Sequence, residues 1–175
     1  MLTLTLCGQS LLAAEKLESG TPVGERPGPY AFNIATGPER GQQFCHICET
    51  GKQPAIIVFA QKESEPLADL LKKLDGVASL TPEDGEIRAW TTFLGEKFTM
   101  KQLSGWAKKA SLKNVVVGAI DDPLGPPTYR LSEKAEVTVL LFVGEKVVAN
   151  FAFAEDELDA KATEKVLKAV PMLKK

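Results

Sequence analysis

The sequence predicts an α/β domain built around a mixed β-sheet. Three observations lead to this prediction. Apolar runs typical of buried strands alternate with amphipathic helices, the last two strands are separated by a two-residue turn, and a helix follows them. From residue 55 onward, the expected order of elements is β-α-β-α-β-β-β-α. The first two strands are then parallel, with a helical crossover between them, and the last two form an antiparallel hairpin.

The first strand and helix have the clearest signals. Residues 55–60 (AIIVFA) form a continuous apolar run with β-branched members, as in a strand covered on both faces. Ser64 can cap the following helix, Pro66 suits its first turn, and Gly76 can end it. One face of this helix carries leucines at helical spacing, at Leu67, Leu70, Leu71 and Leu74.

A second strand and helix follow at residues 86–94 and after Thr99. Thr99 and Gln102 have the spacing of a capping box. The apolar stripe of this helix consists of Leu103, Trp106, Ala107 and Ala110. Trp106 is therefore expected in the core rather than in a binding site.

Strands are also expected at residues 114–120, 136–143 and 146–153, and Gly144 supplies a positive φ to the hairpin turn between the last two. Residues 124–129 contain consecutive prolines and are expected to be irregular.

The last helix is expected to begin at an Asp156 cap, to end at Pro171 and to cover the hairpin. Its apolar stripe would consist of Leu158, Ala162, Val166, Ala169 and Val170.

Composition is that of an ordinary globular protein and argues against two classes of partner. The chain has 175 residues, of which 44% are hydrophobic and 25% charged, and its formal net charge is −2. This balance provides no basic surface for nucleic acid. No basic amphipathic helix suited to a membrane surface is present either.

Residues 1–14 have the apolar character and small terminal residues of a secretory signal, with cleavage near Ala13 or Ala14. No basic residue precedes the apolar run, which leaves open a start upstream of Met1; a frayed N-terminal strand is the alternative. We expect export to the periplasm or the extracellular space, with no stable membrane span after removal of the signal. Removal would also take Cys7 and leave two cysteines in an oxidising compartment.

Residues 15–54 are rich in Gly and Pro, with one short strand-like piece at residues 30–34, and are expected to form a loosely structured arm on the domain at residues 55–175. This arm carries the main chemical candidate, Cys45-His46-Ile47-Cys48. Two cysteines at this spacing can form a small disulfide, and an imidazolium between them would favour the thiolate that performs disulfide exchange. His46 is the only histidine in the chain.

Three interpretations of the pair remain open. It can be a structural disulfide that fixes the arm, a redox-active dithiol tuned by His46, or a soft-metal site formed by Cys45, His46 and Cys48. Covalent haem attachment is excluded because Glu49 stands where a histidine would have to follow the second cysteine.

The order of elements, together with the run at residues 137–142 that leads into the hairpin, resembles the thioredoxin-like fold and its redoxin and peroxiredoxin branch. The resemblance implies a three-layer sandwich, with helices on both faces of a mixed sheet and a C-terminal hairpin plus helix. The chain also resembles uncharacterised exported thioredoxin-like proteins that carry a Cys-x-x-Cys ahead of the first core strand.

The catalytic positions of that family are not matched. Thioredoxin-like enzymes place their cysteines after the first core strand, where this chain has residues 61–64, and a cis-proline before the hairpin, where it has Val137.

The leading functional hypothesis is thiol–disulfide exchange with a protein partner, catalysed by Cys45, Cys48 and His46 without a cofactor. Cys45 is taken as the attacking sulfur by analogy with such motifs. A non-catalytic binding or scaffolding domain is the alternative.

Overall fold

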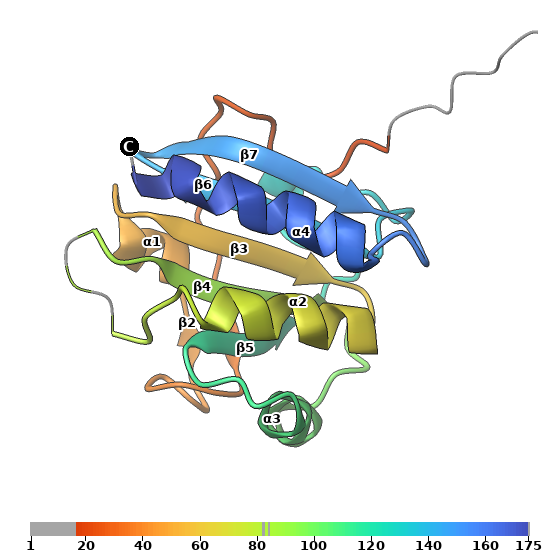
Figure 1. Cartoon of the computed structure of the whole chain (residues 1–175). Helices are drawn as coiled ribbons and strands as arrows, with labels where there is room; N and C mark the ends of the chain where they lie inside the picture. The colour runs from red at the N-terminus through yellow and green to blue at the C-terminus, as the bar shows by residue number, and fades with distance from the viewer. Residues whose placement is uncertain (1–16, 82, 84, 175) are drawn as a thin grey trace, which may run out of the picture.

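The computed structural model describes residues 17–81, 83 and 85–174 (Figure 1). The expected signal at residues 1–14 and Cys7 lie outside the described residues, so export stays a prediction.

Within the described residues, seven strands form one mixed sheet in the order β2-β1-β5-β4-β3-β6-β7. The strands are β1 (Phe32–Ile34), β2 (Gln43–Phe44), β3 (Ala55–Ala60), β4 (Arg88–Leu94), β5 (Val115–Ile120), β6 (Val137–Val143) and β7 (Lys146–Phe153). β4 is parallel to both β3 and β5, whereas β6 is antiparallel to β3 and β7. The expected order of elements from residue 55 and the expected strand directions are confirmed.

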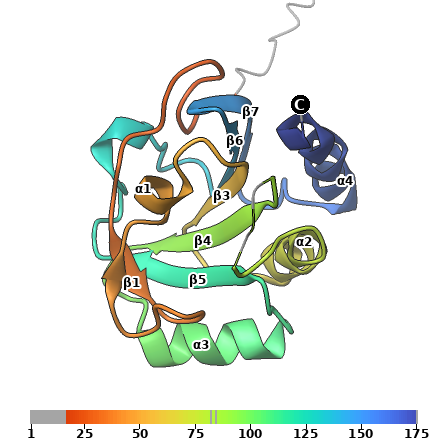
Figure 2. The same cartoon turned by 90° about the vertical axis from the view of Figure 1, so that its left-hand side faces the viewer.

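Helices cover both faces of the sheet. They are α1 (His46–Thr50), α2 (Glu65–Asp75), α3 (Met100–Lys109) and α4 (Ala160–Ala169), with 3₁₀ segments η1 (Pro127–Tyr129) and η2 (Val170–Lys174). Figure 2 shows α1 on one side of the sheet and α2 and α4 on the other. Ser64 and Thr99 cap α2 and α3 as the sequence predicted, each accepting a hydrogen bond from a backbone N–H three residues later.

Each strand divides its side chains between two apolar cores, as β3 shows. Ile56 and Val58 pack with the buried residues of α2, α3 and α4. Ile57 and Phe59 pack on the opposite face, where Ile47 of α1 and the aromatic residues of the N-terminal segment lie. This second core supports the Cys-x-x-Cys segment.

The expectation of a loosely structured arm at residues 15–54 is corrected by the position of β1. This strand pairs with both β2 and β5 and therefore belongs to the central sheet. Gly118 of β5 permits the approach, because a Cβ at this position would collide with the carbonyl oxygen of Asn33. The arm extends the sheet and brings α1 against its face.

The two ends of the last helix, α4, also differ from expectation. The cap of α4 is Asp159, whose carboxylate accepts the N–H of Ala162 at 2.7 Å. Asp156 instead adopts a left-handed conformation, with φ of 63°, in a turn that Glu157 closes by accepting the N–H of Ala154. Pro171 lies inside η2, since the 3₁₀ segment continues directly from α4.

The proline-rich loop at residues 124–129 contains the short η1, because Pro127 can occupy the first position of a 3₁₀ turn. In the hairpin, Glu145 as well as Gly144 has a positive φ, which matches the twist of the two strands.

None of the helices in the described part of the chain is long and apolar enough to cross a membrane.

Candidate functional site

The two cysteines of the motif form a disulfide, Cys45–Cys48, with their Cα atoms 5.3 Å apart. Cys45 is the N-cap of α1, and its Sγ accepts the backbone N–H of Cys48 at 3.3 Å. Thr50 closes the five-residue helix by donating its hydroxyl proton to the carbonyl oxygen of His46 at 2.7 Å. The pair is therefore part of a regular, hydrogen-bonded turn.

The residues of α1 (His46–Thr50) have a buried side and an exposed side. His46 and Ile47 face the second core and are 2% and 7% exposed. Cys48 and Glu49 are exposed, whereas Cys45 is half-buried and packs against the same core. The two buried residues thus anchor α1 to the sheet, and the disulfide lies at the protein surface with Cys48 on its outer side.

His46 lies in a cage of aromatic rings. The ring centroids of Phe44, Trp90 and Phe32 are 4.8, 5.6 and 5.7 Å from its own. Its Nδ1 is 3.3 Å from a guanidinium nitrogen of Arg88, and its buried Nε2 has no hydrogen-bond partner among the described residues. Packing against these three rings and the one polar contact with Arg88 hold the imidazole in place.

These surroundings correct the expected charge of His46. Burial lowers the pKa of His46 to about 4, and the positive charge of Arg88 acts in the same direction. The imidazole is therefore neutral at pH 7. It supplies no positive charge to stabilise a thiolate, and a stabilising imidazolium is not available in this geometry.

A chain of hydrogen-bonded side chains lies beneath His46. Trp90 donates its indole N–H to the hydroxyl oxygen of Tyr30 at 2.8 Å, and this hydroxyl is 2.9 Å from that of Thr92. Tyr129 packs edge-on against Tyr30 and donates to the carbonyl oxygen of Gly28 at 2.9 Å. Burial raises the pKa of both tyrosines far above neutral pH, so they support the site without titrating.

Sequence reasoning did not find Arg88, Trp90 or Tyr30 as parts of this site. The only local signal was a charged residue, Arg88, at the start of an otherwise buried strand. The contact with His46 spans 42 positions and depends on the pairing of β3 with β4.

The position where thioredoxin-like enzymes carry their cysteines is occupied by an ion-pair cluster. Lys62, just after β3, contacts carboxylate oxygens of Glu136 at 2.9 Å and Glu155 at 2.7 Å. Val137 pairs with Ala60 beside it, and every peptide bond in residues 17–81, 83 and 85–174 is trans. Hydrogen bonds to these two carboxylates raise the pKa of Lys62, so the lysine stays charged.

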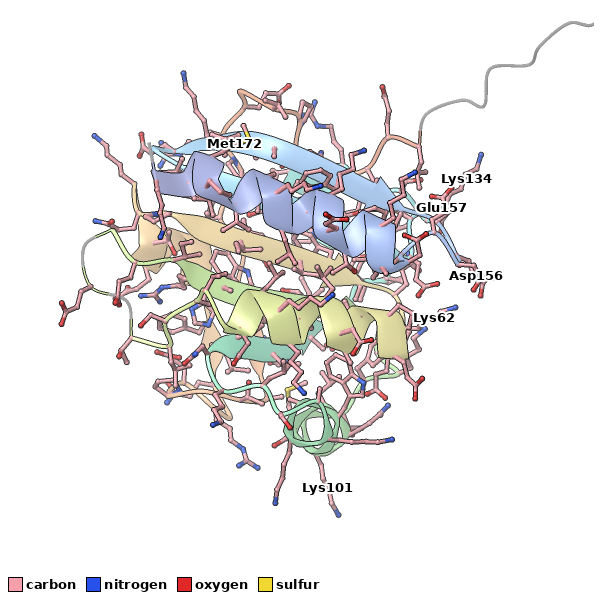
Figure 3. All side chains as sticks on the ribbon, in the orientation of Figure 1. Lys62, Lys101, Lys134, Asp156, Glu157 and Met172 are labelled. Carbon is pink, nitrogen blue, oxygen red and sulfur yellow. A yellow bond between two sulfur atoms is a disulfide. The ribbon has the colours of Figure 1, made fainter. Side chains whose placement is uncertain are left out.

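This cluster and the disulfide lie at opposite ends of the sheet. α1 is near the first residue of β3, whereas Lys62 lies beyond the tip of its arrow (Figures 1 and 3). Six residues of strand separate the two places, which corresponds to about 20 Å. The Cys45–Cys48 disulfide is therefore located away from the end of the sheet where thioredoxin-like enzymes carry their cysteines.

A metal site at Cys45, His46 and Cys48 does not fit these contacts. The two sulfurs are bonded to each other, and the nitrogens of His46 face Arg88 and the aromatic cage. Among the described residues, no group of three or more His, Cys, Asp or Glu side chains is arranged to hold a metal ion.

Two surface hollows lie beside helices of the other face. One, of about 730 Å³, is lined by the end of β7, the turn after it and α4, and the second, of about 440 Å³, by α2 with the two residues before it and by α3. Neither is lined by Cys45 or Cys48.

No family model matches the sequence, and no curated protein does. Solved structures do match. One is a protein from Bacteroides thetaiotaomicron provisionally named a protein disulfide isomerase, with 12% identity, a TM-score of 0.63 and coverage of 89% of this chain and 95% of that one. Another is BsSco, a Sco-family cytochrome c oxidase assembly protein with a disulfide switch, with 14% identity, a TM-score of 0.58 and coverage of 87% and 96%.

A third is the bacterioferritin comigratory protein of Xanthomonas campestris, which has alkyl peroxide reduction activity, with 12% identity, a TM-score of 0.57 and coverage of 83% and 92%. The chain therefore has a thioredoxin-like fold of the redoxin type, as its order of elements predicted. At these identities the likeness concerns the fold.

Proposed function

We propose that this protein performs thiol–disulfide exchange through the Cys45–Cys48 pair, with a thiol- or disulfide-containing protein as its partner. One observation carries the proposal: the pair is bonded at the surface of a thioredoxin-like fold, and one of its two residues is exposed. A disulfide can exchange only when a thiolate reaches one of its sulfurs.

Local geometry supports reversible exchange at this pair. The half-buried Cys45 Sγ already accepts the N–H of Cys48, and the same hydrogen bond would stabilise a thiolate on Cys45 after reduction. His46 has the role of a positioning residue, because its burial among aromatic rings holds α1 and the pair in place. This proposal keeps the three residues of the motif together but replaces an electrostatic role of His46 with a packing role.

The proposed setting is an oxidising compartment, either the periplasm or the extracellular space. The support is the apolar segment at residues 1–14 and the two cysteines left after its removal. A bonded pair is the form expected there before a reducing partner arrives.

The competing function is a non-catalytic binding or scaffolding domain in which the disulfide fixes α1. Two observations favour it. The usual catalytic end of the fold carries Lys62 and its carboxylate partners in place of sulfur, and His46 and Ile47 anchor α1 firmly to the core. In that case the bond would resist reduction and would not cycle.

Turnover of a small disulfide separates the two functions. Purified protein would be incubated with hydroxyethyl disulfide and a reductant regenerated by coupled NADPH oxidation. Catalysis above background by the wild type, lost in the Cys45→Ser/Cys48→Ser variant and kept in Lys62→Gln, supports exchange at this pair. Lys62→Gln is the matched control because it alters the other end of the sheet. Rates equal to background in all three proteins would support the scaffold.

A further inference from the structure

We infer that Cys48, and not Cys45, is the sulfur that forms the mixed disulfide with the partner, and that Cys45 is the leaving and resolving sulfur. This inference rests on the proposed exchange function. It reverses the polarity that analogy with other Cys-x-x-Cys motifs suggests, in which the first cysteine attacks.

The two sulfurs differ in their accessibility to a partner thiolate. A thiolate must approach the attacked sulfur along the S–S axis, from the side opposite the leaving sulfur. Cys45 is half-buried and packs against the core that contains Ile47, so an approach to its sulfur is obstructed by the protein. Cys48 is exposed on the outer side of α1. Solvent and partner therefore meet Cys48 first.

The two sulfurs also differ in how well the protein stabilises a thiolate on them. A sulfur that leaves as a better-stabilised thiolate leaves faster. The N–H of Cys48 points at Cys45 Sγ from 3.3 Å and can donate to the negative charge that develops there. This hydrogen bond directs the electron pair to Cys45.

Exchange proceeds in two thiolate attacks. A partner thiolate attacks Cys48 Sγ, a new bond forms between the partner sulfur and Cys48 Sγ, and the Cys45–Cys48 bond breaks. Its electron pair stays on Cys45 Sγ, which becomes a thiolate that accepts the N–H of Cys48. A second thiolate of the partner then attacks the partner sulfur of the mixed disulfide and releases Cys48 as a thiolate. The partner dithiol is oxidised to a disulfide, and this protein is reduced to a dithiol.

In the reverse direction the same two sulfurs keep their roles. The Cys48 thiolate attacks a partner disulfide and displaces one partner thiolate. The Cys45 thiolate then attacks Cys48 Sγ, restores the Cys45–Cys48 bond and displaces the second. Cys45 is well placed for this step, since the Cα atoms of the two residues are 5.3 Å apart in a regular turn.

Trapping the mixed disulfide tests the inference. Oxidised wild-type protein would be mixed with excess glutathione and quenched with acid within seconds. Free thiols would then be alkylated, and the position of each modification would be found by peptide mass spectrometry. The expected result is glutathione on Cys48 and the alkyl group on Cys45, in at least tenfold excess over the reverse pattern. The reverse pattern would overturn the inference and leave the proposed exchange intact. A Cys45–Cys48 bond that stays intact, with neither an adduct nor free thiols, would overturn both.

Single-cysteine variants provide an independent measurement that does not depend on trapping. Cys45→Ser retains only the exposed thiol and Cys48→Ser only the half-buried one. The rate constants for reaction of their thiolates with glutathione disulfide would be compared after correction for each thiol pKa, with circular dichroism as the check that both variants fold. Cys45→Ser is expected to react about tenfold faster. Equal rates, or a faster Cys48→Ser, would contradict the argument from access.

Discussion

A guanidinium nitrogen of Arg88 lies 3.3 Å from Nδ1 of His46, and this contact fixes the proton on the other ring nitrogen. Arginine has only N–H groups to offer and no acceptor, so Nδ1 must accept with its lone pair. The neutral ring therefore carries its proton on Nε2, which is buried among Phe32, Phe44 and Trp90. Neither nitrogen is free to exchange protons with the thiols of the reduced pair, which is why His46 acts through its position.

The neutral state of His46 predicts a loss of stability in acid. The pKa of His46 is about 4 in the folded protein and about 6.5 when unfolded, so the unfolded chain binds more protons between these values. The contribution of neutral His46 to the free energy of unfolding is fully present above pH 6.5 and decreases as the pH falls toward 4. The total change is about 3 kcal/mol. The free energy of unfolding of the wild type and of His46→Gln, measured by urea denaturation from pH 7.5 to 3.5, checks this. If the difference between the two proteins does not change with pH, His46 is not buried in its neutral form.

Removal of the Arg88 charge is expected to raise the pKa of His46. Arg88→Gln keeps a donor for Nδ1 but removes the repulsion that disfavours the imidazolium. Because burial is the larger cause of the shift, the pKa of His46 should rise above 4 and remain below 6.5. Titration of the single histidine by NMR measures this directly. Arg130→Gln, which changes an exposed arginine paired with Glu25, is the matched control and should leave the titration unchanged.

The hydrogen bonds beneath the site are expected to contribute unequally to stability. Tyr30→Phe leaves the buried indole N–H of Trp90 and the hydroxyl of Thr92 without their shared partner, and should cost about 1–3 kcal/mol. Tyr129→Phe removes a donor to the carbonyl oxygen of Gly28 and leaves no side-chain donor unpaired, so it should cost less. Chemical denaturation followed by tryptophan fluorescence compares the two. A larger loss for Tyr129→Phe would contradict this account of the core.

Glu49 is expected to slow attack by anionic thiols at Cys48. Glu49→Gln should raise the rate of attack by glutathione, which carries a net negative charge, by about two- to threefold at low ionic strength. Attack by mercaptoethanol should change less, because its thiolate carries a smaller negative charge than that of glutathione. Stopped-flow measurement of the two rates in both proteins provides the comparison. An equal effect on both thiols would show that the carboxylate does not act by charge.

Reduction of the disulfide is expected to leave the fold intact. The bond closes a loop with a sequence separation of 3, so its loss should lower the free energy of unfolding by only about 2 kcal/mol. Tyr30, Trp90 and the buried residues of α1 continue to hold the segment. Denaturation with and without phosphine reductant measures the change, and the Cys45→Ala/Cys48→Ala variant should match the reduced wild type. Unfolding on reduction would instead indicate a structural bond.

The sequence predicted those parts of the fold whose signals are local. The apolar run of β3 and the cap of α2 at Ser64 gave bounds that match the structure, because strand burial and helix capping each depend on a few adjacent residues. The short strand at residues 30–34 was predicted, and β1 lies within it, but its pairing with β5 was missed because Asn33 pairs with Ala119, far along the chain. The spacing of Cys45 and Cys48 is a local signal and predicted that the two could bond, with a metal site as an alternative. The neutral charge of His46 is set by burial and by Arg88, which is distant in the sequence, and was not predicted.

The reduction potential of the Cys45–Cys48 pair tests the central claim most directly. Equilibration of the protein with defined ratios of reduced and oxidised dithiothreitol or glutathione, followed by alkylation and mass spectrometry, gives its value. A pair that cycles with a partner should have a potential above about −300 mV, within the range of thiol oxidoreductases. A potential below about −300 mV would contradict thiol–disulfide exchange at this pair and would identify the bond as a structural disulfide that fixes α1.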